Sequence, residues 1–221
     1  ELCINEMPVT LLVINASVYS VNDVTHIGIF DIPMMSNIPN LVYLAPTNKQ
    51  EYLAMMEWSI EQNQYPVAIR APRNGVFYAK NDVDVNYSDI NKYKIVKSGQ
   101  KIAIIALGDF FQMGEELIME IEKQLGINAT LINPRFITGL DEEMLEKLEK
   151  NHNIVITLED GILDGGFGQK IASLYGTSEM NVFNYGLKKE FLDQYDLKKV
   201  MEKNHLQPDL IINDLKNSRC I

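Results

Sequence analysis

One of the three histidines lies in a short loop where it could exchange protons with a substrate. His26 stands between two apolar runs, residues 9–15 and 40–45, each typical of a buried strand. Loops that leave the strands of an α/β sheet are where such proteins usually build their sites. An imidazole with its ordinary pKa of ~6.5 suits proton transfer, but a histidine tied to nearby backbone fits the pattern equally well. His152 and His205 fall near predicted helix ends among polar residues, where we expect them to be solvated.

Two arginines flank a proline at the end of another predicted strand. Arg70 closes the strand over residues 67–70, and Arg73 follows Pro72 in the turn beyond it. A guanidinium in such a turn can bind a phosphate through two parallel hydrogen bonds. The alternative is a surface ion pair, which the local pattern favours in an acidic protein. Arg135 lies in a comparable turn further along, and for it we expect a structural salt bridge or an interface role.

A glycine-rich segment, residues 161–168, has the composition of loops that bind phosphate through backbone N–H groups at a helix start. It matches neither GxGxxG after a strand nor the Walker pattern, and Asp164 would put negative charge where phosphate has to sit. We therefore expect its glycines to allow close packing of the backbone. Glu159 and Asp160 could be an acid and a base, but we interpret them as a helix-capping and interface pair.

Length and composition indicate an ordinary soluble protein of one or two domains, with 221 residues, 46% of them apolar and 23% charged. The 20 basic and 30 acidic residues give a net charge of -10, which disfavours nucleic acid and anionic membranes as partners. Two cysteines, Cys3 and Cys220, predict neither a disulfide framework nor a metal site, and they suit a reducing, cytoplasmic setting. No apolar run approaches the ~20 residues that span a bilayer. Because the chain enters an apolar strand almost at once, we expect it to begin inside a domain.

Hydrophobic periodicity predicts an α/β fold in which strands alternate with helices, so that mostly parallel sheets are flanked by helices. Residues 48–62 have helical spacing, with Asn48 as the N-cap and Glu51 three residues later. Residues 80–99 are polar and predict a linker with at most a marginal strand over 93–96. A second α/β pattern follows. It has strands over 101–107, 129–133, 153–158 and 181–184, helices over 110–125, 141–150 and from the glycine segment to about 175, and a more helical tail over 196–216 that is broken at Pro208.

In combination and order, these landmarks resemble the 1-deoxy-D-xylulose-5-phosphate synthases, thiamine-diphosphate enzymes of the transketolase superfamily. The resemblance covers essentially the whole chain. It implies the C-terminal part of a pyrimidine-binding domain over residues 1–80, a linker over 81–99 and a transketolase C-terminal domain over 100–221. The residues that carry it are Thr25, His26, Gly28, Phe30, Asp31, 38–40 (IPN), Ala45, Pro46, Pro72, Arg73, 130–136 (TLINPRF), 158–161 (LEDG) and 165–168 (GGFG).

The resemblance also implies a reaction and its site residues. The full-length enzyme would join pyruvate to glyceraldehyde 3-phosphate, releasing carbon dioxide and giving 1-deoxy-D-xylulose 5-phosphate for isoprenoid, thiamine and pyridoxal biosynthesis. It would use thiamine diphosphate and Mg²⁺ and form a homodimer. His26 matches the family's loop histidine near the reacting centre, and Arg73 matches the arginine that approaches the phosphate of the aldehyde. Arg70 and Asn22 complete the substrate-binding residues that we expect.

Two departures from the family pattern bear on function. Alignment without gaps places Asn15 and Asn22 where many members have an arginine and an aspartate, so either substrate positioning differs or Asp23 and Arg70 rearrange to compensate. The family's cofactor-activating glutamate and its metal and diphosphate motif lie upstream of anything in these residues. We therefore expect this chain alone to bind neither thiamine diphosphate nor a metal, and to be inactive as a synthase.

Other functions stay open on the sequence. Another enzyme of the superfamily, such as a transketolase or the β subunit of a 2-oxo-acid dehydrogenase, would carry similar landmarks. A non-catalytic domain pair, whose C-terminal domain buries an apolar surface against a partner, would fit as well. Assays with different acceptor substrates separate the enzymes, and a homodimer without cofactor binding would support assembly.

Overall fold

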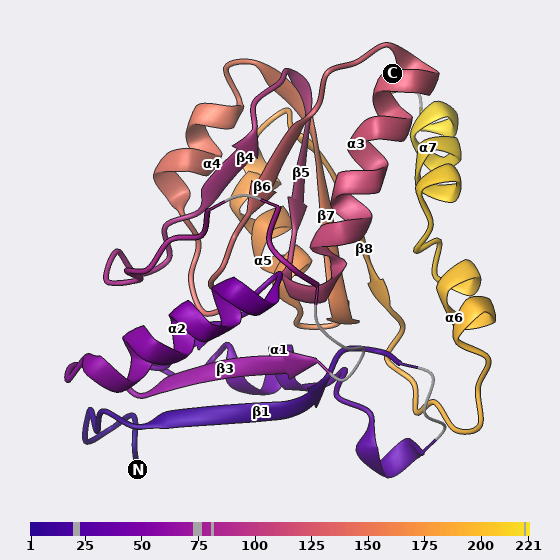
Figure 1. Ribbon diagram of the computed structural model, residues 1–221. Coiled ribbons are helices and arrows are strands. Elements are labelled where there is room, and N and C mark those ends of the chain that lie inside the picture. Colours follow the sequence, from indigo (N-terminus) through magenta and orange to yellow (C-terminus); the bar gives the residue numbers. More distant parts are fainter. Residues whose placement is uncertain (20–22, 73–76, 81, 219) are drawn as a thin grey trace.

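The computed structural model describes residues 1–19, 23–72, 77–80, 82–218 and 220–221, which form two α/β units (Figure 1). With η denoting a 3-10 helix, the first unit comprises β1 (Thr10–Ala16), η1 (Val24–His26), α1 (Asp31–Met35), β2 (Val42–Leu44), α2 (Lys49–Glu61) and β3 (Val67–Pro72). The second comprises β4 (Lys94–Lys97), β5 (Lys101–Ala106), η2 (Gly108–Phe110), α3 (Phe111–Leu125), β6 (Thr130–Asn133), α4 (Glu142–Leu148), β7 (His152–Ile162), α5 (Phe167–Leu174), η3 (Tyr175–Thr177), β8 (Asn181–Leu187), α6 (Leu197–Lys203) and α7 (Pro208–Asn217). The predicted α/β class is confirmed.

In the described part of the first unit, three parallel strands form a sheet in the order β1-β3-β2. Helix α2 begins where its capping pattern predicted, because Asn48 Oδ1 accepts a hydrogen bond from Glu51 N at 2.9 Å. Met55 and Trp58 of this helix pack on one face of the sheet, against a buried cluster that includes Val67 and Ile69. The other face of the sheet is turned toward the second unit.

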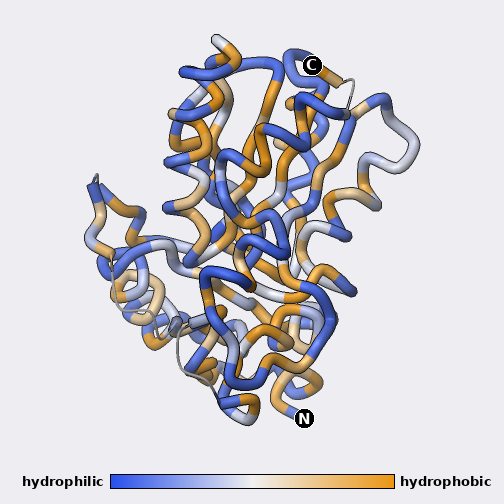
Figure 2. The backbone as a smooth tube through the Cα atoms, turned by 90° about the vertical axis from the view of Figure 1, so that its right-hand side faces the viewer, coloured by the Kyte–Doolittle hydropathy of each residue, from blue (hydrophilic) through white to orange (hydrophobic). Residues whose placement is uncertain are grey.

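The described strands of the second unit form a five-stranded sheet in the order β4-β6-β5-β7-β8. Neighbouring strands are parallel except that β4 runs antiparallel to β6. Strand β4 confirms the marginal strand that was predicted over residues 93–96 of the linker. Figure 1 shows α3 and α7 on one side of this sheet and α4 on the other, and Figure 2 shows hydrophobic strands in the interior. Both faces are therefore buried, as predicted for a parallel sheet. The domain boundaries themselves stay a prediction.

The two units share a core. Tyr43 and Ala45 of the first sheet lie in the same buried cluster as Phe167 of the second unit. Backbone hydrogen bonds continue this contact, because Ala45 N donates to Arg135 O at 2.8 Å and Ile137 N donates to Tyr43 O at 2.8 Å. Residues 135–137 thus pair with the edge of β2, and the interface between the units is both apolar and hydrogen-bonded.

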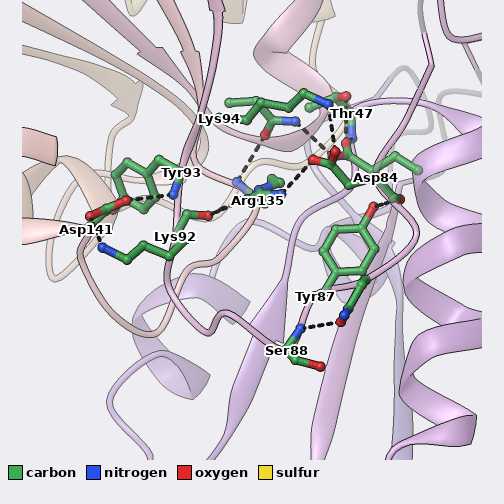
Figure 3. A network of polar contacts seen from close by, with 12 residues as sticks. Thr47, Asp84, Tyr87, Ser88, Lys92, Tyr93, Lys94, Arg135 and Asp141 are labelled. Carbon is green, nitrogen blue, oxygen red and sulfur yellow. Dashed lines mark hydrogen bonds and ion pairs between the residues drawn. The ribbon is translucent and has the colours of Figure 1, made fainter.

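Arg135 of the second unit binds the segment before β4, residues 82–93, which connects the two units (Figure 3). Its guanidinium forms an ion pair with Asp84 at 2.8 Å and donates through Nε to Lys92 O at 3.2 Å. It also lies over the ring of Tyr87, 5.9 Å from the ring centroid. Lys92 Nζ in turn lies 3.0 Å from Asp141, the N-cap of α4. The structural salt bridge expected for Arg135 is confirmed.

Two features expected from composition concern the cysteines and the membrane. Cys3 and Cys220 are both free thiols and partly buried. Within the part of the chain that the structure describes, each helix is too short or too polar to cross a bilayer.

The loop that carries His26 is held against the end of β1 by a close backbone approach. Ser17 N donates to Gly28 O at 2.8 Å, and a β-carbon on Gly28 would lie 2.1 Å from Asn15 O. Asn15 and Ser17 have positive φ angles of 60° and 78°. Asparagine tolerates this left-handed region better than most residues, so Asn15 suits the backbone here. Only glycine fits at position 28 without moving the loop away from the strand.

We therefore expect Gly28→Ala to lower the free energy of unfolding by ~1–3 kcal/mol, because the added methyl group overlaps backbone that cannot rotate away. Gly176→Ala is the matched control, since no atom lies within 4 Å of its added β-carbon. Urea denaturation followed by tryptophan fluorescence measures both, with Trp58 as the only tryptophan. Equal stabilities of the two variants would show that the loop is not packed against β1 in this way.

Candidate functional site

His26 is the last residue of η1, and the N-cap of this short helix is Asp23. Asp23 Oδ1 accepts hydrogen bonds from Thr25 N at 2.9 Å and from Thr25 Oγ1 at 2.7 Å. The hydroxyl and the backbone N–H of Thr25 lower the pKa of Asp23. The hydroxyl of Tyr19 donates to the carbonyl oxygen of His26 and holds the backbone from the other side. The imidazole itself is 58% exposed, so a substrate can reach it.

Arg70, by contrast, is buried at the end of β3 with 2% of its surface exposed. Its Nε lies 2.7 Å from Asp31 Oδ2, its Nη2 lies 3.2 Å from Asp31 Oδ1, and its Nη1 pairs with Asp160. The hydroxyl of Tyr43 donates to the same Asp31 carboxylate. Burial lowers the pKa of Arg70, but Asp160 and Asp31 outweigh it and hold the pKa well above its ordinary value. The sequence favoured an ion pair at the surface. The ion pair is present, but it is buried. A substrate-binding role for Arg70 stays a prediction.

The two carboxylates that Arg70 binds come from different units of the molecule. Asp31 begins α1, five residues after His26, whereas Asp160 lies in β7 of the second unit. A backbone hydrogen bond beside them, from Ile162 N to Ile29 O at 2.9 Å, joins the same two segments. Arg70 thus fixes the end of the histidine loop to the carboxyl end of β7.

Glu159 is also buried, and it caps a helix. Its carboxyl oxygens accept hydrogen bonds from Phe167 N and Gly168 N at the start of α5, each at 2.8 Å. A β-carbon on Gly166 would lie 2.4 Å from Glu159 Oε2, and one on Gly168 would lie 2.5 Å from Thr157 Oγ1. The glycine segment therefore serves close packing, and its N–H groups bind a side chain of the protein itself. The capping and interface interpretation of Glu159 and Asp160 is confirmed.

The structure does not bring all the predicted site residues together. No hydrogen bond or ion pair joins the described side chains of His26 and Arg70, which are connected through residues 27–31. Asn22 and Arg73 lie outside the described residues. His205 is exposed, as predicted, and pairs with Asp214.

The prediction for His152 was wrong. This residue begins β7 and is partly buried, because its two ring nitrogens contact Leu148 O at 3.0 Å and Thr130 Oγ1 at 2.8 Å. Sequence reasoning also missed the pairing of Arg70 with Asp31. The only signal for this pairing in the sequence was Asp31 itself, an acidic residue at the start of the apolar helix α1.

Among the described residues, no group of three His, Cys, Asp or Glu side chains is placed to hold a metal ion. Three buried carboxyl groups have partners within the chain. Glu51, a buried carboxyl group, accepts hydrogen bonds from Thr47 N at 2.8 Å and from Asn133 Nδ2 at 2.9 Å. Glu159 is occupied by α5 and Asp160 by Arg70. Whether this chain binds thiamine diphosphate by itself stays a prediction.

Fold and site together define a protein of two α/β units that meet at buried ion pairs, with an exposed histidine on the adjoining loop. Comparison of the sequence with protein families identifies the family to which the chain belongs. Residues 2–77 match the family described as transketolase, pyrimidine binding domain, and residues 91–207 match transketolase, C-terminal domain. The chain belongs to the transketolase family. The predicted order of a pyrimidine-binding domain followed by a C-terminal domain is confirmed.

Curated relatives are 1-deoxy-D-xylulose-5-phosphate synthases. The protein of Lachnoclostridium phytofermentans is 30% identical over 224 residues, which cover 99% of this chain and 35% of that protein. That of Alkaliphilus oremlandii is 33% identical over 221 residues, covering 98% of this chain and 35% of that protein. That of Clostridium perfringens is 35% identical over 176 residues, which cover 77% of this chain and 27% of that protein. The chain thus spans about a third of the length of these relatives.

A solved structure shares the fold. It is described as a split gene transketolase, inactive beta4 tetramer, and it superposes with a TM-score of 0.81 over 97% of this chain and 67% of that one. The two sequences are 22% identical, so this likeness concerns the fold alone.

Glu159 predicts a specific pH dependence of stability. Burial raises its pKa to about 8, against the opposing effect of the two backbone N–H groups. A carboxyl group whose pKa is higher in the folded than in the unfolded state stabilises the fold at low pH, and this contribution is lost as pH rises from about 4 to about 8. Over this range the free energy of unfolding should fall more steeply in the wild type than in Glu159→Gln. Urea denaturation at a series of pH values measures the difference, and equal slopes would contradict the assignment.

Proposed function

We propose that the chain is the later part of a thiamine-diphosphate-dependent synthase that condenses pyruvate with glyceraldehyde 3-phosphate. The products are 1-deoxy-D-xylulose 5-phosphate, a precursor for isoprenoids, thiamine and pyridoxal, and carbon dioxide. The observation that carries the proposal is the similarity to a synthase of this name at 30% identity over 99% of the chain. Because these residues span about a third of such a protein, the activity is proposed for the full-length enzyme.

The described residues support different roles for the histidine and the buried arginine. The 58% exposure of the imidazole supports a role for His26 in giving or taking a proton, or in hydrogen-bonding the substrate. Arg73 and Asn22 are proposed to contact the substrate, with Arg73 at the phosphate of glyceraldehyde 3-phosphate. For Arg70, the ion pairs with Asp31 and Asp160 support positioning of the loop more directly than contact with the substrate.

Thiamine diphosphate and Mg²⁺ belong to the full-length enzyme in this proposal. The cofactor supplies the carbanion chemistry when bound, and general acids and bases alone do not replace it. Because these 221 residues span about a third of such a synthase, we propose that the metal ligands and the cofactor-activating glutamate come from outside them. The chain alone would then be inactive. A cytoplasmic location is also proposed.

The outer edge of β1 supports a larger functional unit. Among the described residues, β1 pairs with β3 along one edge, and its other edge is bridged only at Ala16, by Gly28. Leu12 and Ile14 on this strand are 49% and 69% exposed, which is unusual for adjacent apolar side chains at an unpaired sheet edge. We propose that further protein covers this edge in the functional enzyme, which we expect to be a homodimer. The same exposed edge favours the second candidate function, a domain pair whose role is assembly.

In the full-length enzyme, His26→Ala should slow turnover by ~100-fold or more, because a group that transfers a proton is lost. His205→Ala is the matched control, since His205 is also an exposed histidine paired with an aspartate and should leave turnover unchanged. The assay follows pyruvate consumption with glyceraldehyde 3-phosphate as acceptor.

Ribose 5-phosphate and lipoamide acceptors in the same assay separate the alternatives. Turnover with either of these in place of glyceraldehyde 3-phosphate would identify another enzyme of the superfamily. Full activity of His26→Ala would leave His26 with a structural role only. No activity with any acceptor, together with a stable dimer that binds no cofactor, would favour assembly.

A further inference from the structure

The hydrogen bonds around His26 determine which of its ring nitrogens carries the proton. Thr25 Oγ1 lies 2.7 Å from Asp23 Oδ1 and 2.7 Å from His26 Nδ1. The same Nδ1 lies 3.1 Å from the other carboxylate oxygen, Asp23 Oδ2. The carboxylate, the hydroxyl and the imidazole therefore form a closed set of contacts within one turn of chain.

Counting donors gives the direction of each contact. An ionised carboxylate only accepts hydrogen bonds, and the pKa of Asp23 is lowered by its contacts with Thr25. Thr25 has a single hydroxyl proton, and it has to point at Asp23 Oδ1. Only lone pairs of Oγ1 are then left for His26, so Nδ1 has to be the donor in this contact. The contact of Nδ1 with Asp23 Oδ2 requires the same proton.

We propose that Asp23 is a positioning residue that, together with Thr25, holds His26 in the tautomer protonated at Nδ1. Nε2 is then the unprotonated nitrogen, and among the described residues it has no hydrogen-bond partner. In a histidine, the tautomer is set by the hydrogen bond that the other nitrogen makes. His26 would therefore meet the substrate as a proton acceptor at Nε2. Only this last step rests on the proposed function, because the tautomer follows from the contacts alone.

His152 provides a reference inside the same molecule. Its Nδ1 lies 3.0 Å from Leu148 O, a carbonyl oxygen that can only accept. Its Nε2 lies 2.8 Å from Thr130 Oγ1, whose own lone pair already accepts a hydrogen bond from Gly99 N at 2.9 Å. The carbonyl requires a proton on Nδ1, and burial lowers the pKa of His152, so in the neutral ring Nε2 is unprotonated and accepts from the Thr130 hydroxyl. The ring of His26 should thus resemble that of His152.

Nuclear magnetic resonance of the 221-residue chain, with ¹⁵N-labelled histidine, reads the tautomer directly. The chain has three histidines, and His26→Gln identifies the His26 signals by their loss. In the neutral imidazole, we expect Nε2 of His26 at the unprotonated position and Nδ1 at the protonated one. A protonated Nε2 as the main form of His26 would overturn the proposal.

Two variants test the role of the partners. Thr25→Ser keeps the hydroxyl and should keep the wild-type tautomer. In Asp23→Asn/Thr25→Val the hydroxyl is lost and an amide N–H can donate to Nδ1, so the Nε2 signal should shift toward the protonated position. Asp23 and His26 side chains are about half exposed, and exposed ion pairs contribute little to stability, so the variants should stay folded. An unchanged tautomer in the double variant would also overturn the proposal.

The full-length enzyme gives the matching kinetic result. Asp23→Asn/Thr25→Val should lower kcat by ~10-fold or more with little change in KM for glyceraldehyde 3-phosphate, whereas Thr25→Ser should retain turnover. Unchanged kcat in the double variant would contradict the positioning role. If the wild-type enzyme does not condense the two substrates at all, the proposed function fails, while the resonance experiment still decides the tautomer.

Discussion

A single buried guanidinium joins the parts of this molecule that form its candidate site. Arg70 lies between Asp31, at the start of α1, and Asp160, in β7 of the second unit. A buried ion pair adds little net stability over apolar packing, but breaking one by removing a partner typically costs ~3–5 kcal/mol. An arrangement that kept these groups buried but separated the segments would leave a charge unpaired. We infer that the pair specifies how the two units meet.

The histidine loop depends on this interface at one end and on β1 at the other. Asp31 and Ile29 bind its end to the second unit, while Gly28 lies against the backbone of β1. His26 precedes these attachments by two to five residues, and its imidazole stays exposed. A rigid frame around an exposed titratable group is what a site for proton transfer requires. The frame is supplied by strand ends that are far apart in sequence.

Periodicity and capping predicted most of the elements, because these signals are local. Asn48 shows this for the start of α2, and Glu159 for the start of α5. Local signals failed at β7, which was expected to end at residue 158 but continues through Ile162. Two successive acidic residues are typical of a strand end, yet here both are buried because partners elsewhere in the chain bind them. The partner of Asp160, Arg70, is distant in sequence, and no local pattern identifies it.

The site was predictable to a similar extent. The position of His26 on a loop beside strand ends followed from the sequence, but its contact with Asp23 through Thr25 did not. The alignment without gaps drew attention to Asn22, at the position of the family's aspartate. In the structure, the carboxylate that contacts His26 belongs to Asp23, one residue later. Such a contact depends on the backbone turn of η1 and on the rotamers of three side chains, which sequence pattern does not give.

Differential scanning calorimetry of the 221-residue chain measures directly whether Arg70 joins the two units. We predict one transition with equal calorimetric and van't Hoff enthalpies for the wild type, because the units share a core and a buried ion pair. Arg70→Met, which leaves Asp31 and Asp160 without their partner, should lower Tm by roughly 10 °C. Lys203→Met, at an exposed ion pair with Glu190, should not change it. Two separate transitions in the wild type, or an unchanged Tm in Arg70→Met, would contradict a single unit held at Arg70.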